Sequence, residues 1–301
     1  MPKFAIIDTH LHIFDPARLT YPWHGSIPQL DRPFLLPDFD EHRAAVDVER
    51  MVFLECDVAP HDRLAEAQWV TQEAQADPRI QAIVASAPLE NGASARPDLE
   101  ALAELSLVHG IRRLIQDEPD DDFCVQPDFI AGVKLLAEFG FTFDICIQHR
   151  HMANAVRLAR SCPEVRFILD HIGKPAIGDG LLEPWRQHLG ELADLPNVHC
   201  KMSGLVTAAD HAEARAASGA AMTFSWTREQ LRPYIDHVIE SFGFDRVMYG
   251  GDWPVSTLAA KYPDWVAALD WATAGSSEEE LQKLYRRNAI GFYRLADPSG
   301  G

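Results

Sequence analysis

The sequence predicts an α/β fold, a (β/α)8 TIM barrel in a single domain that spans residues 1-301. Three observations predict it. Eight short runs rich in Val, Ile and Phe alternate with amphipathic stretches, as strands and helices alternate in parallel α/β folds. The chain has 301 residues, a length at which such barrels commonly form one domain. No glycine-rich fingerprint follows the first run, which disfavours a doubly wound nucleotide-binding sheet.

The expected strands are apolar and end at polar, Gly or Pro positions, which is typical of strands. In chain order they are Phe4–His12, Arg50–Asp57, Ile80–Leu89, Gly110–Gln116, Phe141–Gln148, Arg166–Gly173, Val198–Gly204 and Asp245–Pro254. The expected helices between and after them are His61–Ala76, Pro97–His109, Pro127–Phe139, Met152–Arg160, Leu182–Asp194, Trp226–Phe242 and Ser277–Arg294. Pro97 and Pro127 stand near helix starts and Gly140 follows a helix end, as capping preferences predict.

Two connections are unusually long. Residues 13-40 contain five prolines and several aromatic side chains, and residues 205-227 are rich in alanine. Each connection follows an expected strand, so both leave the barrel at the carboxyl ends of the strands. Long loops at that end of a barrel usually shape or cover the site, and we expect both to lie over the active-site face. A flexible surface insertion is the alternative for residues 205-227.

Composition excludes several classes of protein. The net charge of -18 repels phosphate backbones and argues against nucleic-acid binding. The five cysteines are widely spaced and form no C-x-x-C pair, which is typical of reduced thiols in a cytoplasmic protein. No signal peptide precedes the first strand and no apolar run reaches membrane-span length. The sequence leaves open whether the chain forms a homo-oligomer.

The first expected strand carries a histidine pair. Residues two apart on a strand share a face, so Asp8, His10 and His12 are expected to point inward, with Ile7 and Leu11 on the opposite face. Two imidazoles at this spacing can bind one metal ion. The structural alternative is that the pair is packed and serves no chemistry.

Asp252 ends the last expected strand, after two glycines that allow other groups to approach closely. In a closed barrel this strand lies beside the first, so Asp252 can join His10 and His12 as a metal ligand and can also take a proton from water. An aspartate that begins a helix or turn is the structural alternative.

His171 follows the sixth expected strand. If Phe167, Leu169 and His171 share a face, His171 reaches the rim as a ligand, an electrophile or a proton donor. Lys174, just beyond it, can bind an anionic group. A packed core histidine is the structural alternative for His171.

Six motifs together resemble those of the amidohydrolase-related (amidohydrolase 2) branch of the amidohydrolase superfamily, and in particular sugar lactonases such as L-fuconolactonase and L-rhamnonolactonase. They are Ile7–His12, Gly110–Arg112, Leu169–Pro175, Lys201–Leu205, Tyr249–Pro254 and Arg287–Tyr293. The resemblance covers nearly the whole chain, and it implies a metal-dependent type of hydrolase and a barrel fold.

This sequence departs from the binuclear members of the superfamily, which use a bridging lysine on the middle strands and further histidines. The fourth strand here offers Arg112 and Gln116, and the fifth turns Gln148 inward and leaves His149 off the metal face. The branch that the chain resembles works with one divalent ion or with none. We therefore expect at most one ion, zinc or manganese, and leave its requirement open.

Other side chains at the ends of the strands are candidates for substrate binding. Arg112 has a planar fork that suits carboxylate or lactone oxygens. Gln148 and Ser203 can hydrogen-bond to substrate. Glu55 can contact substrate or metal, and a structural salt bridge is an equally good interpretation of it. Trp23 and Trp253 can form an apolar wall for a sugar ring, or simply pack within loops.

The sequence thus predicts a hydrolase that opens an aldonolactone, a small-molecule sugar-acid lactone, with water activated by Asp252. Three alternatives remain open at this point. A hydrolase of dicarboxylate lactones of the pyrone or muconolactone type would use arginines and lysines to hold carboxylates. A metal-dependent decarboxylase of an aromatic acid shares the first-strand motif, and a non-catalytic sugar-acid binder is the remaining class.

Overall fold

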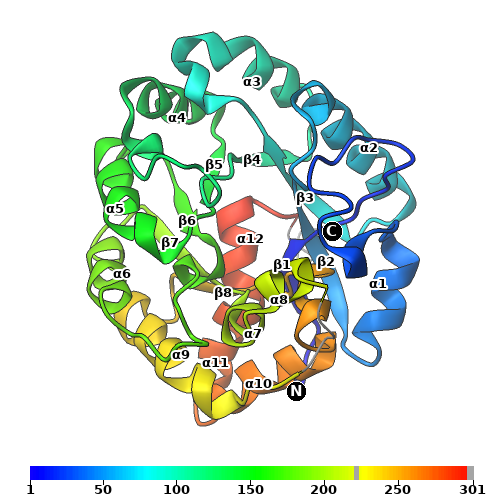
Figure 1. Ribbon diagram of the computed structural model, residues 1–301, viewed down its shortest axis with the longest axis vertical. Helices are drawn as coiled ribbons and strands as arrows, with labels where there is room; N and C mark the ends of the chain where they lie inside the picture. Colours follow the sequence, from blue (N-terminus) through cyan, green and yellow to red (C-terminus); the bar gives the residue numbers. More distant parts are fainter. Residues whose placement is uncertain (220–223, 297–301) are drawn as a thin grey trace.

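Eight parallel strands form the barrel. The computed structural model describes residues 1–219 and 224–296, and its strands pair in sequential order from β1 to β8. They are β1 (Ile6–Leu11), β2 (Val48–Leu54), β3 (Ile80–Ser86), β4 (Val108–Arg112), β5 (Thr142–Ile145), β6 (Phe167–Leu169), β7 (Val198–Met202) and β8 (Val247–Tyr249). A parallel bridge between Leu11 and Trp253 brings the segment after β8 back to β1, so the sheet nearly closes (Figure 1). The predicted (β/α)8 barrel is confirmed.

Helices surround the strands (Figure 1). They are α1 (Leu36–Arg43), α2 (Arg63–Ala76), α3 (Arg96–Ala103), α4 (Pro127–Phe139), α5 (Met152–Ser161), α6 (Trp185–Ala193), α7 (Leu205–Ala209), α8 (Ala212–Ala217), α9 (Arg228–Phe242), α10 (Tyr262–Ala272), α11 (Glu278–Gln282) and α12 (Asn288–Tyr293). Short 3-10 helices lie between them: η1 (Pro28–Leu30), η2 (Pro60–Asp62), η3 (Leu89–Ala95), η4 (Phe123–Val125), η5 (His149–His151), η6 (Asp170–Gly173) and η7 (Val255–Leu258). A π-helical turn, η8 (Lys283–Arg287), joins α11 to α12.

Local sequence signals place several helix ends. Pro127 is the first residue of α4, and Gly140 ends it with a φ of 69°, in the left-handed region that glycine adopts without strain. Thr227 caps α9, because its side chain accepts from the Gln230 amide and the Gln230 side chain accepts in return. These ends agree with the predicted boundaries to within two residues.

Some segments expected to be loops contain helices. The connection 13-40 runs into α1, and the connection 205-227 contains α7 and α8, whose alanines favour a helix. Residues 220–223 of that connection, like 297–301 of the predicted domain, lie outside the described residues. The helix α10 was not expected, because it is apolar on most sides and shows little helical periodicity. The helix is buried between α9 and α1, which explains why most of its sides are apolar.

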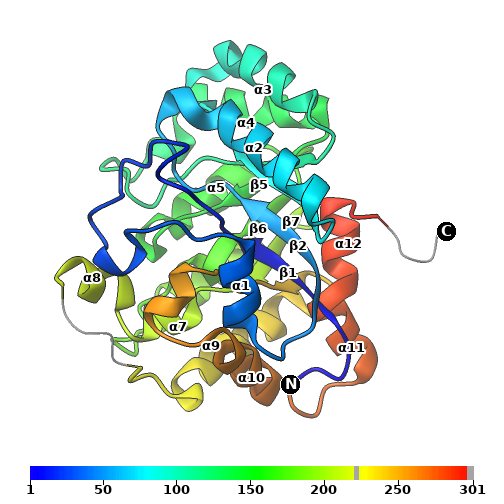
Figure 2. The same ribbon diagram turned by 90° about the vertical axis from the view of Figure 1, so that its right-hand side faces the viewer.

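The barrel interior holds a small apolar cluster of its own. It contains Ile7, Val52, Leu54, Ala82, Val84, Ile168 and Met248 from the strands, together with Ala289, Phe292 and Tyr293 of α12 and Leu295 just after it. Strands on opposite sides of the barrel meet in this cluster, so these side chains point inward, and α12 closes the base. Figure 2 shows α12 and α8 at opposite ends of the barrel. The prediction that Ile7 faces the helices is therefore wrong.

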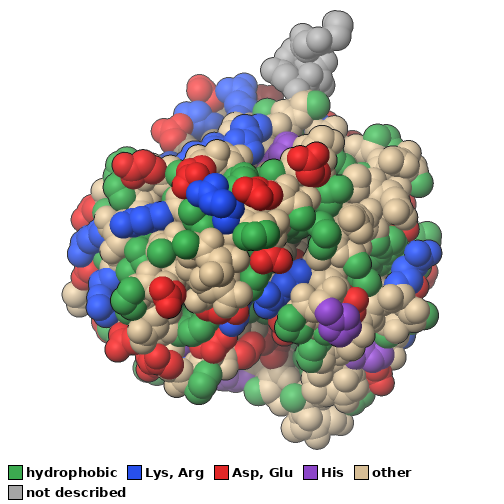
Figure 3. Space-filling view, turned by 90° about the horizontal axis from the view of Figure 1, so that it is seen from above, with side chains coloured by type: hydrophobic (Ala, Val, Ile, Leu, Met, Phe, Trp, Pro, Cys, Tyr) green, Lys and Arg blue, Asp and Glu red, His purple; other side chains and the backbone are tan. Residues whose placement is uncertain are grey.

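The distribution of surface charge and the state of the cysteines can be compared with what the composition predicts. Acidic, basic and apolar side chains are interspersed over the face shown in Figure 3. Among the described residues all five cysteines are free and buried, as predicted for reduced thiols. Within the same ranges, no helix is long and apolar enough to cross a membrane.

His199 at the barrel base makes stability depend on pH. Its ring lies 4.8 Å from the Phe292 ring, and burial, then Arg246, lowers the pKa of His199 from 6.5 to about 4. Between these values the unfolded chain binds more protons than the folded chain, so the free energy of unfolding falls as the pH falls from about 6.5 to about 4. We expect a loss of at most about 3 kcal/mol from this group.

Urea unfolding of the wild type and of His199→Gln at a series of pH values checks this prediction. The pH dependence should be shallower in the variant over that interval, because the glutamine cannot titrate. Parallel curves for the two proteins would contradict it.

Candidate active site

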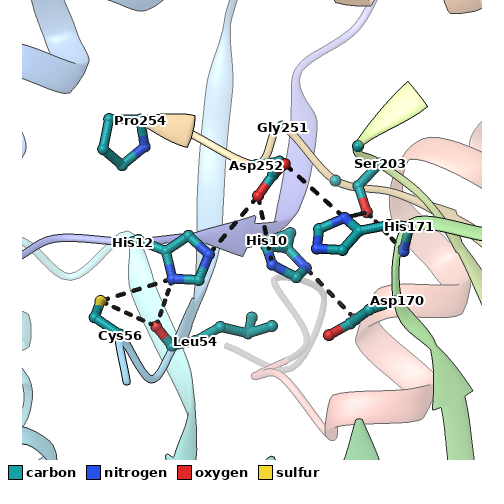
Figure 4. Close-up of polar contacts among 12 residues, drawn as sticks. His10, His12, Leu54, Cys56, Asp170, His171, Ser203, Gly251, Asp252 and Pro254 are labelled. Carbon is teal, nitrogen blue, oxygen red and sulfur yellow. Dashed lines mark hydrogen bonds and ion pairs between the residues drawn. The ribbon is translucent and has the colours of Figure 1, made fainter. Parts of the chain in front are cut away.

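Three imidazoles converge on one carboxylate at the carboxyl end of the barrel. The Oδ1 atom of Asp252 lies 3.7 Å from His10 Nε2 and 3.8 Å from His12 Nε2, and Oδ2 lies 3.9 Å from His171 Nδ1 (Figure 4). All four side chains are buried. The sequence predicted each of these residues, and the structure brings them together at one point.

A register shift in β1 places the histidine pair. Ile7 points into the barrel, whereas Asp8 points toward α10, where Tyr262 and the Gly251 amide donate to its carboxylate at 2.8 Å. The pairing of β1 with β2 is irregular between Asp8 and Leu11, so the chain changes face before His10. The prediction that Asp8 shares the inward face of the histidines is wrong, because simple alternation does not cross such an irregularity.

The two glycines before Asp252 allow a close approach, as expected. A Cβ atom at Gly250 would lie 2.8 Å from the His10 Cβ, and one at Gly251 would lie 2.3 Å from an Asp8 oxygen. The Asp252 amide donates to the His10 carbonyl at 2.8 Å, and Asp252 itself has a φ of 55°. Strained non-glycine residues of this kind cluster at functional sites.

His171 reaches the site by a different route from the predicted one. Phe167 and Leu169 pack outward against the helices, and Ile168 points inward. Simple alternation along β6 would therefore point Asp170, and not His171, toward the site. His171 instead has a φ of 53°, which turns its ring back toward His10, 4.4 Å away between ring centroids. Its Nδ1 atom lies 2.9 Å from Ser203 Oγ.

Gly204 makes room for this ring. The residue has a φ of 69°, and a Cβ atom there would lie 2.7 Å from atoms of the His171 ring. The predicted residue Ser203 is fully buried, and its oxygen faces both the amide and the ring of His171. Ser203 therefore holds His171, and its predicted contact with substrate stays a prediction.

A layer of buried charges lies beneath the histidines. The Lys201 ammonium is 2.8 Å from Asp144 and 2.9 Å from Asp170, and all three side chains are fully buried. The strand pattern alone predicts no role for Asp170 or Lys201. Their positions in the Leu169–Pro175 and Lys201–Leu205 motifs were a usable signal, because buried charges usually come in pairs.

Arg112 joins this layer to the site. Its guanidinium donates to Glu55 at 2.6 Å, lies 3.5 Å from Asp170, and approaches His10 Nε2 to 3.3 Å. The structure contains the salt bridge that was one of the alternatives for Glu55, and its partner is Arg112. Whether Arg112 and Glu55 also contact substrate stays a prediction.

Burial sets the protonation states of the site. Desolvation raises the pKa of the Asp252 carboxyl, with smaller opposing contributions from His12 and Lys174. Desolvation also lowers the pKa of His10 and of His171 well below the usual value, and the charge of Lys201 adds to the effect on His10. The two rings are therefore neutral at neutral pH, and Asp252 is a stronger base than an exposed aspartate.

Donor atoms of His10, His12 and Asp252 all lie within 4.8 Å of one another, which suits one divalent ion. His12 Nδ1 lies 2.9 Å from the Leu54 carbonyl, an arrangement that turns its Nε2 lone pair toward Asp252. His10, Asp170 and His171 form a second such group, but Asp170 already pairs with Lys201 and Arg112. The first group, which the sequence predicted, therefore fits an ion better.

The remaining predicted residues lie around this centre. The Lys174 ammonium is 3.2 Å from Glu213 of α8. Burial lowers the pKa of Lys174, but the charges of Glu213, Cys146 and Asp252 and the hydrogen bond to Glu213 together outweigh burial and raise it. Gln148 is half-buried beyond the end of β5, and its contact with substrate stays a prediction. Trp23 is also half-buried, and its indole donates to the Cys56 carbonyl at 2.7 Å, beside Glu55.

Trp253 does not face this centre. It is fully buried, and its ring packs against Phe34, Phe39 and His42, to which its indole nitrogen donates at 2.8 Å. The side chain therefore presents no surface to a substrate. It packs against neighbouring side chains, as in the alternative interpretation. The predicted sugar-binding role of Trp253 is not retained.

A parallel barrel with histidines and an aspartate at the carboxyl ends of β1, β6 and β8 defines a class of barrel enzymes, whose active sites lie at that end. The chain belongs to the amidohydrolase family, whose model matches residues 7–295. An L-fucono-1,5-lactonase from Burkholderia multivorans is 31% identical, over 97% of this chain and 97% of its own. A second L-fucono-1,5-lactonase, from Burkholderia ambifaria, is 29% identical over 98% and 97%.

Solved structures show the same similarity. The crystal structure of a Burkholderia multivorans amidohydrolase with bound zinc superposes with a TM-score of 0.83. The two chains are 29% identical, and the match covers 97% of this chain and 100% of the other.

Proposed function

We propose that this enzyme opens a sugar-acid lactone to the free acid, with Asp252 as the general base. The observation that carries the proposal is the convergence of three buried imidazoles on a carboxylate whose pKa is raised by burial. A base of this kind can take a proton from water at neutral pH. The two relatives named as L-fucono-1,5-lactonases support a sugar-acid lactone as the substrate class.

In the proposed reaction a water oxygen attacks the lactone carbonyl carbon while Asp252 accepts a proton from that water. The ring C–O bond then breaks, and the protonated Asp252 returns the proton to the leaving ring oxygen. The product is an open-chain hydroxy acid, and Asp252 ends as it began. One residue can serve both steps because burial keeps its pKa above that of an ordinary carboxylate.

The oxyanion formed during attack needs a donor. Arg112 lies 3.3 Å from His10 and carries a permanent charge, and His171 is held by Ser203 with its ring beside Asp252. Preorganised donors in a buried site stabilise such a charge more than water does. We assign this role to Arg112 or His171, and the positioning of ring hydroxyls to Glu55, Gln148 and Trp23.

His10, His12 and Asp252 would hold a divalent ion, zinc or manganese, which would act as a Lewis acid on the lactone carbonyl. The Arg112 guanidinium 3.3 Å from His10 Nε2 opposes tight binding, because it places a positive charge beside a ligand atom. We therefore expect dialysis against a chelator to remove any bound ion and to leave at least a tenth of the turnover.

Elemental analysis before and after dialysis, with initial rates on the same samples, checks this prediction. Readdition of zinc or manganese is the control for damage during dialysis. A loss of turnover beyond a hundredfold that either ion restores would contradict the expectation and make the ion essential.

The charge balance of the site favours a neutral substrate over a dicarboxylate lactone. Arg112 pairs with Glu55, Lys174 with Glu213, and Lys201 with Asp144 and Asp170, so each cation already has an acidic partner. A substrate that brings further carboxylates would have to displace one of these partners, and Asp252 would repel it. Repulsion from Asp252 would also favour release of the acid product.

A pH-indicator assay tests the proposal. The panel contains aldonolactones, among them L-fucono-1,5-lactone, and dicarboxylate lactones of the pyrone and muconolactone types, each with an enzyme-free control for spontaneous opening. We expect acid release from an aldonolactone at a rate at least a hundredfold above that from any dicarboxylate lactone. No enzymatic acid release from the aldonolactones would overturn the proposal, and carbon dioxide release from an aromatic acid would identify the decarboxylase alternative.

A further inference from the structure

Trp185 lies in the outer helix layer and reaches a carbonyl beside the active site. It is the first residue of α6 and is buried, and its indole nitrogen donates to the Ile172 carbonyl at 2.6 Å. Ile172 directly follows His171, and both have φ values near 50°. Left-handed backbone is unfavourable for a β-branched residue such as isoleucine, so the surroundings must hold this turn.

The turn decides where His171 points. Regular alternation along the strand would point Asp170 toward the site. The left-handed backbone at His171 brings its ring to Ser203 and Asp252 instead. The turn is closed by the Lys174 amide, which donates to the His171 carbonyl at 2.8 Å. The Ile172 carbonyl lies in the middle of the turn, and Trp185 fixes it.

Trp265 makes an equivalent contact on the other side of the site. It lies on α10, is buried, and donates from its indole nitrogen to the Gly250 carbonyl at 2.9 Å. Gly250 approaches the His10 side chain closely and stands two residues before Asp252, whose φ is 55°. At both places a residue with left-handed backbone and a reactive side chain lies within two residues of a carbonyl that a tryptophan of an outer helix binds.

We infer that Trp185 and Trp265 are positioning residues, which act through hydrogen bonds to the Ile172 and Gly250 carbonyls to hold His171 and Asp252 in their reactive geometry. The inference rests on the proposed function for its kinetic readout. A small displacement of a catalytic group slows the chemical step strongly, while substrate binding, which uses other side chains, changes little. Loss of either indole N–H should therefore lower kcat much more than it changes KM.

The competing explanation is that both indoles only fill the space between helices and strands. The Trp185 ring does pack against Tyr234 and His237, and the Trp265 ring stacks on Tyr249. A side chain that only fills space would affect the melting temperature when it is shortened and would leave kcat well below that temperature unchanged. Kinetics and stability therefore separate the two explanations.

Trp69 offers a matched control. It is a buried tryptophan on α2, but its indole nitrogen donates at 2.8 Å to Glu73 of the same helix and not to a strand end. The experiment measures kcat, KM and melting temperature for Trp185→Phe, Trp265→Phe and Trp69→Phe, at a temperature at which all are folded. We expect kcat to fall at least tenfold in the first two variants with KM within twofold, and Trp69→Phe to keep the wild-type kcat.

A kcat within twofold of that of Trp69→Phe in both test variants would overturn the inference. If the wild type opens no lactone, the proposed function fails, and crystal structures of the wild type and of Trp185→Phe decide the inference instead. A left-handed turn at His171 and Ile172 that persists in the variant, with His171 still on Ser203, would overturn it. A relaxed turn with His171 displaced would support it without any activity.

Discussion

Replacing Asp252 with asparagine should lower lactone turnover by about a thousandfold, in the range that removal of a general base usually costs. Asparagine has the shape of aspartate but cannot accept a proton from water or return one to the leaving oxygen. Folding should persist, because the substitution removes a buried charge whose desolvation raises the pKa of the carboxyl in the native protein. Initial rates on an aldonolactone and a urea unfolding curve measure the two effects.

Glu213→Gln is the matched control for charge in this region. Glu213 pairs with Lys174 at 3.2 Å on α8 and is assigned no part in proton transfer. The control should retain at least a tenth of the wild-type turnover. If Asp252→Asn also keeps more than a tenth while its fold is intact, another group is the base and the proposed mechanism is wrong.

The barrel could be predicted because strand periodicity and spacing are carried by many residues at once. All eight expected strands are present, although β6 and β8 are shorter than the apolar runs that contain them. The ends of those runs leave the sheet to form the site, as at Asp252, where the chain takes a φ of 55°. A sequence pattern does not distinguish the last residue of a strand from the first residue of a functional turn.

The site was predicted in its residues more than in its geometry. His10, His12, Asp252 and His171 meet, yet strict alternation misplaced Asp8, and it assigned His171 to a strand face that Asp170 occupies. In both cases the backbone departs from the regular strand, by a register shift in one and a left-handed turn in the other. The register shift in β1 has no signal in the residue types nearby. The turn at His171 has one in Gly173, whose φ is 78°, but nothing marks Ile172, because a β-branched residue seldom adopts left-handed backbone.

The buried charges beneath the site were also missed, since their meaning depends on contacts between distant strands. Lys201 on β7 meets Asp144 of β5 and Asp170 after β6, and the phenol of Tyr293 donates to Asp144 at 2.7 Å. A lysine in a short apolar run predicts a buried charge. Its acidic partners lie on other strands, so they can be identified only once the arrangement of the strands in the barrel is known. These pairs hold His10 from below, because Asp170 lies 3.5 Å from its Nδ1 atom.

Replacing Lys201 with methionine should be the most destabilising of the single substitutions considered. Lys201 is fully buried between two carboxylates, and its removal leaves Asp144 and Asp170 without their shared cation. Removing one partner of a buried ion pair costs about 3–5 kcal/mol. We expect a loss of that size in the free energy of unfolding at pH 7.5, measured by urea unfolding.

The pH dependence of this loss identifies its cause. Desolvation already raises the pKa of Asp144 to about 6 in the native protein, and removal of the Lys201 charge, which lowers that pKa, must raise it further. A carboxyl whose folded pKa exceeds its unfolded value destabilises the protein fully above the folded pKa, and the penalty shrinks as the pH falls toward the unfolded value. The gap between Lys201→Met and the wild type should therefore narrow from pH 7.5 to pH 5.

Two further variants separate charge from packing. Lys201→Met combined with Asp144→Asn should recover part of the lost stability at pH 7.5, because the asparagine carries no charge to leave unpaired. Lys283→Met removes a surface lysine that pairs with Asp245 at 2.8 Å, and it should change stability far less. If the double variant is no more stable than Lys201→Met and the gap does not depend on pH, lost packing is the cause, and the buried charges do not support the site as argued.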